Sequence, residues 1–176
     1  SYDYYLIDSF ETSINYSNKI LKDHKNSSTS LLVRATCNLT LGNYKLAYLD
    51  YNKLSTMKNF REDLKNYAFL NSTICKFYLK EDSSYIKDFK SIIKISKDTL
   101  RIAKCYAFLK DEGKSMELLK SFNSLDIDSL SKNNSFIQAE IYSLLNKKDL
   151  AFQQLEKHLE NGKSRYRLIE LYYGFD

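Results

Sequence analysis

A small side chain recurs along this sequence at nearly constant intervals, and this recurrence constrains the fold more than any other feature. The positions are Ala35, Thr73, Ala103 and Ala139, so successive copies are 38, 30 and 36 residues apart. A repeat of about 35 residues is typical of arrays in which each unit is a pair of α-helices. The spacing therefore predicts that similar units stack in sequence order along the chain.

Apolar residues follow a helical period through most of the chain. Phe10, Ile14 and Leu21, for example, fall on one side of a helix. Clusters of Ser, Asn, Asp and Gly interrupt this pattern regularly, and their polar side chains can cap the helix that follows. We expect roughly ten helices of about 10 to 18 residues, joined by short links. The residues expected to end or join helices with a positive φ are Gly42, Gly113 and Gly162.

Close packing of neighbouring helices explains why the recurring residue is small. Two antiparallel helices approach to about 8 Å only where small side chains meet. Ala35 with Ala47, and Ala139 with Ala151, are expected to form such crossings. Larger residues of the second helix would then fill the gap towards the next pair, namely Tyr51, Phe89, Leu119 and Leu155. The predicted fold class is all-α, an array of antiparallel helix pairs.

Composition agrees with a helical fold and argues against several other classes. Hydrophobic residues make 43% of the 176 residues, which is enough to form a core. The chain has no Pro and four Gly, too few for the tight turns of an all-β fold. No apolar run of about eighteen residues occurs, so we expect no membrane span.

The balance of charges argues against nucleic acid as the main partner. The net charge is +5, from 27 Lys and Arg against 22 Asp and Glu. Few of the cations are Arg, and Lys alternates with acidic residues, which is typical of solvated helix faces. A stacking platform for single-stranded RNA needs aromatic rings interleaved with cations on one face. Arg165, Tyr166 and Arg167 show a short mixture of this kind.

The three cysteines are Cys37, Cys75 and Cys105, each two residues after the recurring small residue. No C-x-x-C pair occurs, and both histidines are distant in sequence, so a zinc site is not indicated. Equivalent positions on successive helices favour buried, reduced thiols that act as small hydrophobic residues. Reduced thiols point to a reducing compartment, and a cytoplasmic location is the expectation.

The sequence lacks the short motifs that carry catalysis. It has no G-x-G-x-x-G, P-loop, H-E-x-x-H or G-x-S-x-G motif. We interpret His24 and His158 as solvated or structural side chains, because a catalytic base needs an orienting partner. Three acidic pairs are interpreted as helix starts, where negative charge is favoured: Glu62–Asp63, Glu81–Asp82 and Asp111–Glu112. We expect no enzymatic activity, no cofactor and no metal site.

Two segments resemble the tetratricopeptide repeat family. Leu41–Ala47 is similar to the Leu-Gly-x-Tyr-x-x-Ala turn of that family, and Ala139–Tyr142 with Ala151–Leu155 matches its small and aromatic pattern. The chain departs from the family at Tyr85, where a small residue is expected, and no copy ends in the family's Pro.

The resemblance implies one domain over residues 1–176, a right-handed superhelical array of antiparallel helix pairs. About four pairs would cover residues 28–160, with partial repeats at 3–24 and 163–176. Because such a chain would begin and end within a repeat, we expect a fragment of a longer protein.

The resemblance also implies a concave groove, lined by the first helix of each pair, that binds a peptide or protein. The binding residues carried over copy by copy are Tyr67, Leu70, Asn71, Tyr78, Lys97, Arg101, Lys104 and Phe108. Further groove positions are Thr29, Leu32, Thr36, Ile74, Phe136, Glu140 and Leu144.

Some family members clamp a C-terminal carboxylate. Asn71, Lys97 and Arg101 match three of the clamp positions, whereas Leu32 and Thr36 do not match the others. Lys97 and Arg101 are four residues apart, so on one helix face they could hold a carboxylate by charge-assisted bonds.

The predicted function is therefore a non-enzymatic scaffold for a protein or a mainly hydrophobic peptide. Two alternatives keep the same fold. One is a sensory or regulatory domain of a bacterial transcription regulator or signalling protein, and the other is an RNA-binding helical repeat. The ends of the array could also self-associate.

Overall fold

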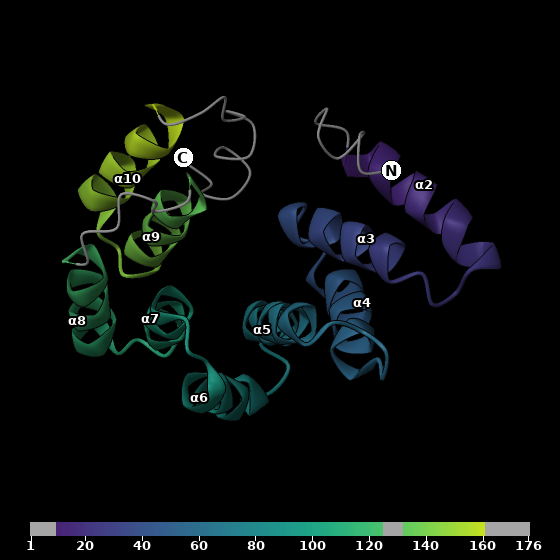
Figure 1. The fold of residues 1–176 in the computed structure, drawn as a ribbon, viewed down its shortest axis with the longest axis horizontal. Coiled ribbons are helices and arrows are strands. Elements are labelled where there is room, and N and C mark those ends of the chain that lie inside the picture. The colour runs from purple at the N-terminus through teal and green to yellow at the C-terminus, as the bar shows by residue number, and fades with distance from the viewer. Residues whose placement is uncertain (1–9, 125–131, 161–176) are drawn as a thin grey trace. The chain divides into compact units, whose positions relative to one another are not determined.

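The computed structural model describes residues 10–124 and 132–160, and all regular secondary structure in these ranges is helical (Figure 1). The helices are α2 Phe10–Asp23, α3 Ser28–Thr40, α4 Tyr44–Thr56, α5 Glu62–Leu79, α6 Ser84–Ile95, α7 Thr99–Phe108, α8 Glu112–Asn123, α9 Lys132–Leu144 and α10 Lys148–Glu160. Their lengths run from 10 residues in α7 to 18 in α5. The predicted all-α class is confirmed over the described ranges.

The chain divides into two compact units. The first ends at Tyr85 and the second begins at Ile86, so the boundary lies within α6. In the first unit α3 packs against α2 and α4, and α4 also packs against α5. In the second unit α7 packs against α8 and α9, and α9 also packs against α10. Three of the predicted pairs, α3–α4, α7–α8 and α9–α10, are therefore packed helical hairpins.

A residue in the left-handed conformation follows the first helix of every predicted pair. Gly42, Lys80, Lys110 and Asn146 have φ angles of 74°, 53°, 61° and 58°. They lie 38, 30 and 36 residues apart, the same steps as the recurring small residue. Positive φ ends a helix by turning the chain so that the last carbonyls can be reached by later N–H groups. The backbone therefore repeats in register with the sequence.

Three of these helix ends also close with the same hydrogen bond. After α3 the Asn43 N–H donates to the Asn38 carbonyl at 2.8 Å. The equivalent bonds after α7 and α9 run from Asp111 to Tyr106 at 2.9 Å and from Lys147 to Tyr142 at 2.8 Å. A bond that spans five residues is typical of the Schellman motif.

The prediction for Gly42 is confirmed, but the prediction for Gly113 is wrong. Gly113 lies in the first turn of α8, and Lys110 takes the positive φ at this link. The reason is the cap of α8, because the Asp111 carboxylate accepts a hydrogen bond from the Lys114 N–H at 3.2 Å and starts the helix before Gly113. Gly162 lies outside the described residues.

Polar residues cap helices at other breaks, as predicted. The Ser27 hydroxyl accepts from the Ser30 N–H at 3.4 Å at the start of α3. The Asp98 carboxylate accepts from the Arg101 N–H at 3.1 Å at the start of α7. Each bond satisfies a backbone donor that has no partner within its own helix.

The recurring small residues lie at buried helix crossings. Ala35 and Ala47 are fully buried between α3 and α4, and Ala103 and Ser115 between α7 and α8. The Ser115 hydroxyl donates to the Ala103 carbonyl at 2.9 Å, so these two helices touch through their small residues. The residues predicted to fill the gaps are also buried: Tyr51, Phe89, Leu119 and Leu155. The packing prediction is confirmed.

The outermost predicted repeats are described in part. In α2, Phe10, Ser13 and Ser17 are buried, as expected of a second helix, whereas Ile20 is 37% exposed. The partial repeat at 163–176 and the cluster at Arg165–Arg167 lie outside the described residues. Within the described ranges, no helix combines the length and hydropathy needed to cross a membrane.

Candidate binding surfaces

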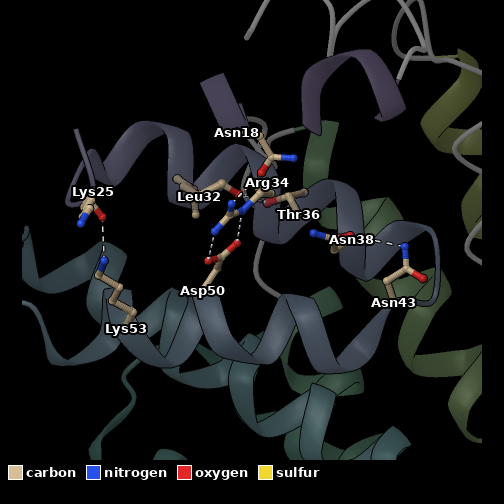
Figure 2. Close-up of polar contacts among 9 residues, drawn as sticks. All are labelled: Asn18, Lys25, Leu32, Arg34, Thr36, Asn38, Asn43, Asp50 and Lys53. Carbon is tan, nitrogen blue, oxygen red and sulfur yellow. Dashed lines mark hydrogen bonds and ion pairs between the residues drawn. The ribbon is translucent and has the colours of Figure 1, made fainter. Parts of the chain in front are cut away.

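A polar network ties three helices of the first unit together (Figure 2). Arg34 of α3 donates from Nε to Asp50 Oδ2 at 2.7 Å and from Nη2 to Asp50 Oδ1 at 2.8 Å, across to α4. Its Nη1 donates to Asn18 Oδ1 of α2 at 2.7 Å. The hydrogen bond to Asp50 is the main reason why the pKa of Arg34 is raised. Because two hydrogen bonds join Arg34 to Asp50, the pair holds α3 and α4 in one rotation relative to each other. The network is therefore part of what stabilises the fold.

Two further bonds tie the ends of the α3–α4 hairpin (Figure 2). Lys53 Nζ donates to the Lys25 carbonyl at 2.6 Å, and Asn43 Nδ2 donates to Asn38 Oδ1 at 3.3 Å. The hairpin is therefore held at its middle and at both ends, which makes it a firm support for the side chains that α5 presents.

Four of the predicted binding residues lie on α5, and the structure separates them by exposure. Tyr67 and Tyr78 are 38% and 40% exposed, whereas Leu70 and Asn71 are buried. Asn71 Nδ2 donates to the Tyr67 carbonyl at 2.9 Å, so the amide serves α5 itself. The accessible side chains among these four are therefore aromatic.

The Tyr67 ring is supported by the hairpin beneath it. It meets the Tyr51 ring edge-on, with ring centroids 6.2 Å apart. Tyr51 is fully buried, and its hydroxyl lies 3.0 Å from Thr36 Oγ1 of α3. Thr36 was predicted to face the groove. In the structure it contacts Tyr51, which in turn contacts Tyr67. An exposed ring on a rigid base is a common form of interface anchor.

A chain of aromatic contacts surrounds Tyr78. Its ring stacks on Tyr44 of α4 at a centroid distance of 4.6 Å and an interplanar angle of 13°. Phe77 meets Tyr78 edge-on at 5.3 Å and Tyr85 edge-on at 5.4 Å. These four rings come from the start of α4, the end of α5 and the start of α6.

Lysines accompany these rings. Lys76 Nζ lies 5.8 Å from the centroid of the Tyr48 ring, within range of a cation–π interaction. Lys45 follows Tyr44 and Lys80 comes directly after α5, and both are exposed. We call the whole set the tyrosine–lysine surface: Tyr44, Lys45, Tyr48, Lys76, Phe77, Tyr78, Lys80 and Tyr85.

Two carboxylates border the tyrosine–lysine surface. Glu81 and Asp82 are exposed and follow Lys80. Asp82 accepts a hydrogen bond from the Ser84 N–H at 2.6 Å at the start of α6. The Ser84 hydrogen bonds are the main cause that lowers the pKa of Asp82, and Lys76 adds to this effect. Lys45 and Lys80 add exposed positive charge to this part of the chain.

The predicted residues of the second unit have different surroundings. Lys97 precedes α7, which starts at Thr99, so the prediction that Lys97 and Arg101 share one helix face is wrong. The Asp98 cap explains this, because it starts the helix after Lys97. Arg101 Nε lies 3.9 Å from Asp98 Oδ2. Phe108 is 4% exposed and stacks on Phe89 at 5.1 Å.

Lys104 is paired with a residue that was itself predicted to face the ligand. Its Nζ donates to Glu140 Oε2 at 2.8 Å, which joins α7 to α9, and the two side chains are 15% and 16% exposed. Lys104 is therefore engaged within the unit. The predicted groups Asn71 and Lys97 belong to different units.

The three thiols are free and buried, which confirms the prediction for Cys37, Cys75 and Cys105. Burial raises the pKa of Cys37 to about 11 and the pKa of Cys75 and of Cys105 to about 12. A nucleophilic cysteine needs a lowered pKa and access, so these thiols are packing residues.

The two histidines and the acidic pairs lie at or near helix ends. His24 is exposed just after α2, and the His158 ring lies 5.4 Å from Phe136. The acidic pairs lie at helix starts, as predicted, with Glu62 and Asp63 in the first turn of α5. Among the described residues, no three His, Cys, Asp or Glu side chains are grouped so that they could hold a metal ion.

The sequence reasoning missed most of the tyrosine–lysine surface. Of its eight residues only Tyr78 was predicted to bind a ligand. The signal was present in part, because Tyr44 and Tyr78 each lie near the link that follows a first helix. What the sequence did not show is that the start of α4 and the end of α5 lie side by side.

Comparisons with protein-family models, with curated proteins and with solved structures found no match for this chain.

Proposed function

We propose that this chain is a non-enzymatic scaffold that binds a protein or peptide. The proposal includes a right-handed superhelical array of helix pairs as its frame. It is supported by packed hairpins that repeat in register and by thiols whose pKa values do not suit nucleophilic chemistry.

One observation carries the proposal, the supported and exposed ring of Tyr67. Its side chain is 38% exposed, while Leu70 and Asn71 beside it on α5 are buried. The contact with Tyr51, and through it with Thr36, restricts the ring before any partner arrives. A partner that packs on a restricted ring loses less conformational entropy than one that must order it. Tyrosines of this kind often contribute strongly to binding.

The second unit, considered by itself, offers charged groups to an acidic partner. Lys97 is exposed, and Arg101 lies at the outer limit of an ion pair with Asp98. Both groups could meet a carboxylate at moderate cost, because surface ion pairs contribute little to stability. Lys104 would first have to leave Glu140.

Affinity capture from a nuclease-treated lysate of the source organism tests the proposal. We expect the wild-type chain to enrich specific proteins and Tyr67→Ala to lose them. The matched control is Tyr16→Ala, which removes a 40% exposed ring from α2. The double variant Lys97→Glu with Arg101→Glu tests the charged part separately.

The outcomes separate the site from the function. If no protein is enriched over an unrelated helical protein, the scaffold proposal fails. If proteins are enriched but Tyr67→Ala retains them all, the function stands and the assignment of Tyr67 fails.

A further inference from the structure

One side of α6 carries a row of exposed lysines that belongs wholly to the second unit. Lys87, Lys90 and Lys94 are three and four residues apart, a spacing that places side chains on one face of a helix. Ile86 lies four residues before Lys90, so it is beside the row on the same face, and it is 36% exposed. We call the three lysines the α6 lysine row.

The other side of α6 is packed against the rest of the second unit. Phe89 and Ile92 are buried, and the Phe89 ring stacks on Phe108 of α7 with ring centroids 5.1 Å apart. Because this side of the helix is occupied by the core, the lysine row is held on the solvent side. The row is therefore a fixed set of cations on a rigid helix.

The positive charge of the α6 lysine row is not compensated. Asp88 is the one carboxylate of α6, and it falls roughly 160° round the helix from Lys90. Within the described parts of the chain, no carboxylate forms an ion pair with Lys87, Lys90 or Lys94. Other lysines of the second unit do have carboxylate partners, namely Lys104, Lys114 and Lys147.

We propose that the α6 lysine row binds the surface of a lipid bilayer that contains acidic headgroups. The three ammonium groups would lie at the headgroups, and the Ile86 side chain would enter the apolar part of the interface. The proposal goes beyond the scaffold function and does not depend on it, because it uses neither Tyr67 nor the pair Lys97 and Arg101.

The chemistry of the row suits a diffuse negative surface. Lysine carries a compact, hydrated charge and lacks the paired donors with which arginine grips a single phosphate or carboxylate. Attraction to an acidic membrane needs no such geometry, and each lysine near the surface strengthens binding by a factor of about five. Three lysines therefore predict an affinity roughly 100-fold higher for acidic than for neutral membranes. Binding should be reversible and should weaken as salt is added.

Two other acidic partners fit the row less well. A partner helix needs a seam of exposed apolar residues at helical spacing, whereas Ile93, seven residues after Ile86, is half-buried. A nucleic acid strand would meet the lysines, but the row contains no aromatic ring on which a base could stack. The exposed Ile86 side chain would also gain nothing from a phosphate backbone, whereas a bilayer offers it an apolar environment.

Co-sedimentation with vesicles of phosphatidylcholine containing roughly 30% phosphatidylserine tests the proposal. We expect the wild-type chain to bind these vesicles and not vesicles of phosphatidylcholine alone. Replacement of all three lysines of the row by Gln should weaken binding roughly 100-fold. Replacement of the same three by Arg should preserve it, because the charge is retained.

Two matched controls use other exposed positions of the chain. The first loses the same charge away from the row and should lose little affinity, because charges far from the membrane are screened; it combines Lys22→Gln, Lys58→Gln and Lys120→Gln. The second compares two isoleucines of α6. Ile86→Ser should weaken binding about 3-fold. Ile95→Ser should have no effect, because Ile95 is 63% exposed but lies roughly 140° round the helix from Lys90.

Several results would overturn the proposal. They are equal binding to neutral and acidic vesicles, no binding to acidic vesicles at low salt, or wild-type affinity in the triple Gln variant. Equal losses in the triple Gln variant and its dispersed control would show that only net charge matters. Tighter binding of polyglutamate or of a single-stranded oligonucleotide than of vesicles, lost in the triple Gln variant, would assign the row to that polymer instead. Circular dichroism of each variant separates loss of the site from loss of the fold.

Discussion

Tyr78 in the first unit and Phe108 in the second occupy the same place in the repeat, five residues after Thr73 and Ala103. Phe108 is 4% exposed and stacks on Phe89 of α6, with an interplanar angle of 9°. Tyr78 is 40% exposed and stacks on Tyr44 at the start of α4. The same helical position thus gives a core ring in one unit and a surface ring in the other, because the neighbouring helix meets it differently.

The two units also use their buried ion pairs differently. Arg34 and Asp50 join the two helices of one hairpin, α3 and α4. Lys104 and Glu140 join the first helices of two successive hairpins, α7 and α9. The first pair secures a repeat and the second connects repeats.

The substitution with the largest expected effect tests the difference between Phe108 and Tyr78. Phe108→Ala should lower the free energy of unfolding by about 4 kcal/mol, because it leaves a cavity against Phe89. Tyr78→Ala should cost much less, because the ring is 40% exposed. Urea unfolding followed by circular dichroism measures both values. Equal losses would show that Tyr78 belongs to the core.

The two buried ion pairs should differ in what their removal costs. Asp50→Ala should destabilise by about 2 kcal/mol, because it leaves two donors of the partly buried, rigid Arg34 guanidinium unused. Glu140→Ala should cost about 1 kcal/mol, because the flexible Lys104 side chain can turn its ammonium to water. Asp63→Ala, which removes an exposed partner of Arg61 at the start of α5, is the control and should cost only about 0.3 kcal/mol. The same unfolding assay checks all three, and a larger loss in Glu140→Ala than in Asp50→Ala would contradict this ranking.

The residues with positive φ that follow helices allow a finer comparison of stability. Gly42 and Lys110 occupy equivalent links, with φ angles of 74° and 61°. Gly42→Ala should destabilise by about 1 kcal/mol, since a Cβ is disfavoured at positive φ. Lys110→Gly should stabilise by about 0.5 kcal/mol, because relief of the same strain exceeds the entropy cost of Gly.

Thermal melting measures these two shifts. Lys110→Ala is the control for Lys110→Gly, because it also loses the bond from Lys110 Nζ to the Leu144 carbonyl but keeps the backbone strain. Stabilisation by Lys110→Ala would attribute the gain to the side chain rather than to φ.

The thiols should have an effect that appears only at high pH, a loss of stability. Cys75 and Cys105 have pKa values of about 12, above the ordinary value of 9.0, because burial disfavours the thiolate. A raised pKa in the folded state means that the contribution is complete below pH 9 and is lost as the pH rises towards 12. Comparison of Cys75→Ala with the wild type from pH 8 to pH 10.5 isolates this slope. A thiol reagent at pH 8 should react only after urea is added, and fast reaction of the folded chain would contradict the assignment.

Much of the fold followed from local patterns. Ala35, Ala103 and Ala139 marked the crossings, clusters of polar residues marked the breaks between helices, and the helix lengths agreed with the apolar period. These features depend on a few neighbouring residues, so a sequence displays them directly. Gly113 was misread because glycine permits a positive φ but does not require it, and the cap at Asp111 determined where α8 starts.

The candidate sites were less accessible to the same reasoning. The helical period shows which residues share a face of α5, but it does not show that Leu70 is buried while Tyr78 is exposed. It also does not reveal that Lys104 has Glu140 as its partner, 36 residues away. Exposure and pairing depend on the crossing angle and axial offset between two helices.

The order of small and apolar residues was therefore sufficient to specify the helices and their crossings, because each of these is set by interactions over a few residues. The stacking of Tyr44 on Tyr78, the support of Tyr67 by Tyr51 and the pairing of Lys104 with Glu140 emerged only from the packed helices. They join side chains from different helices, and such contacts form only when the backbones that carry them come together.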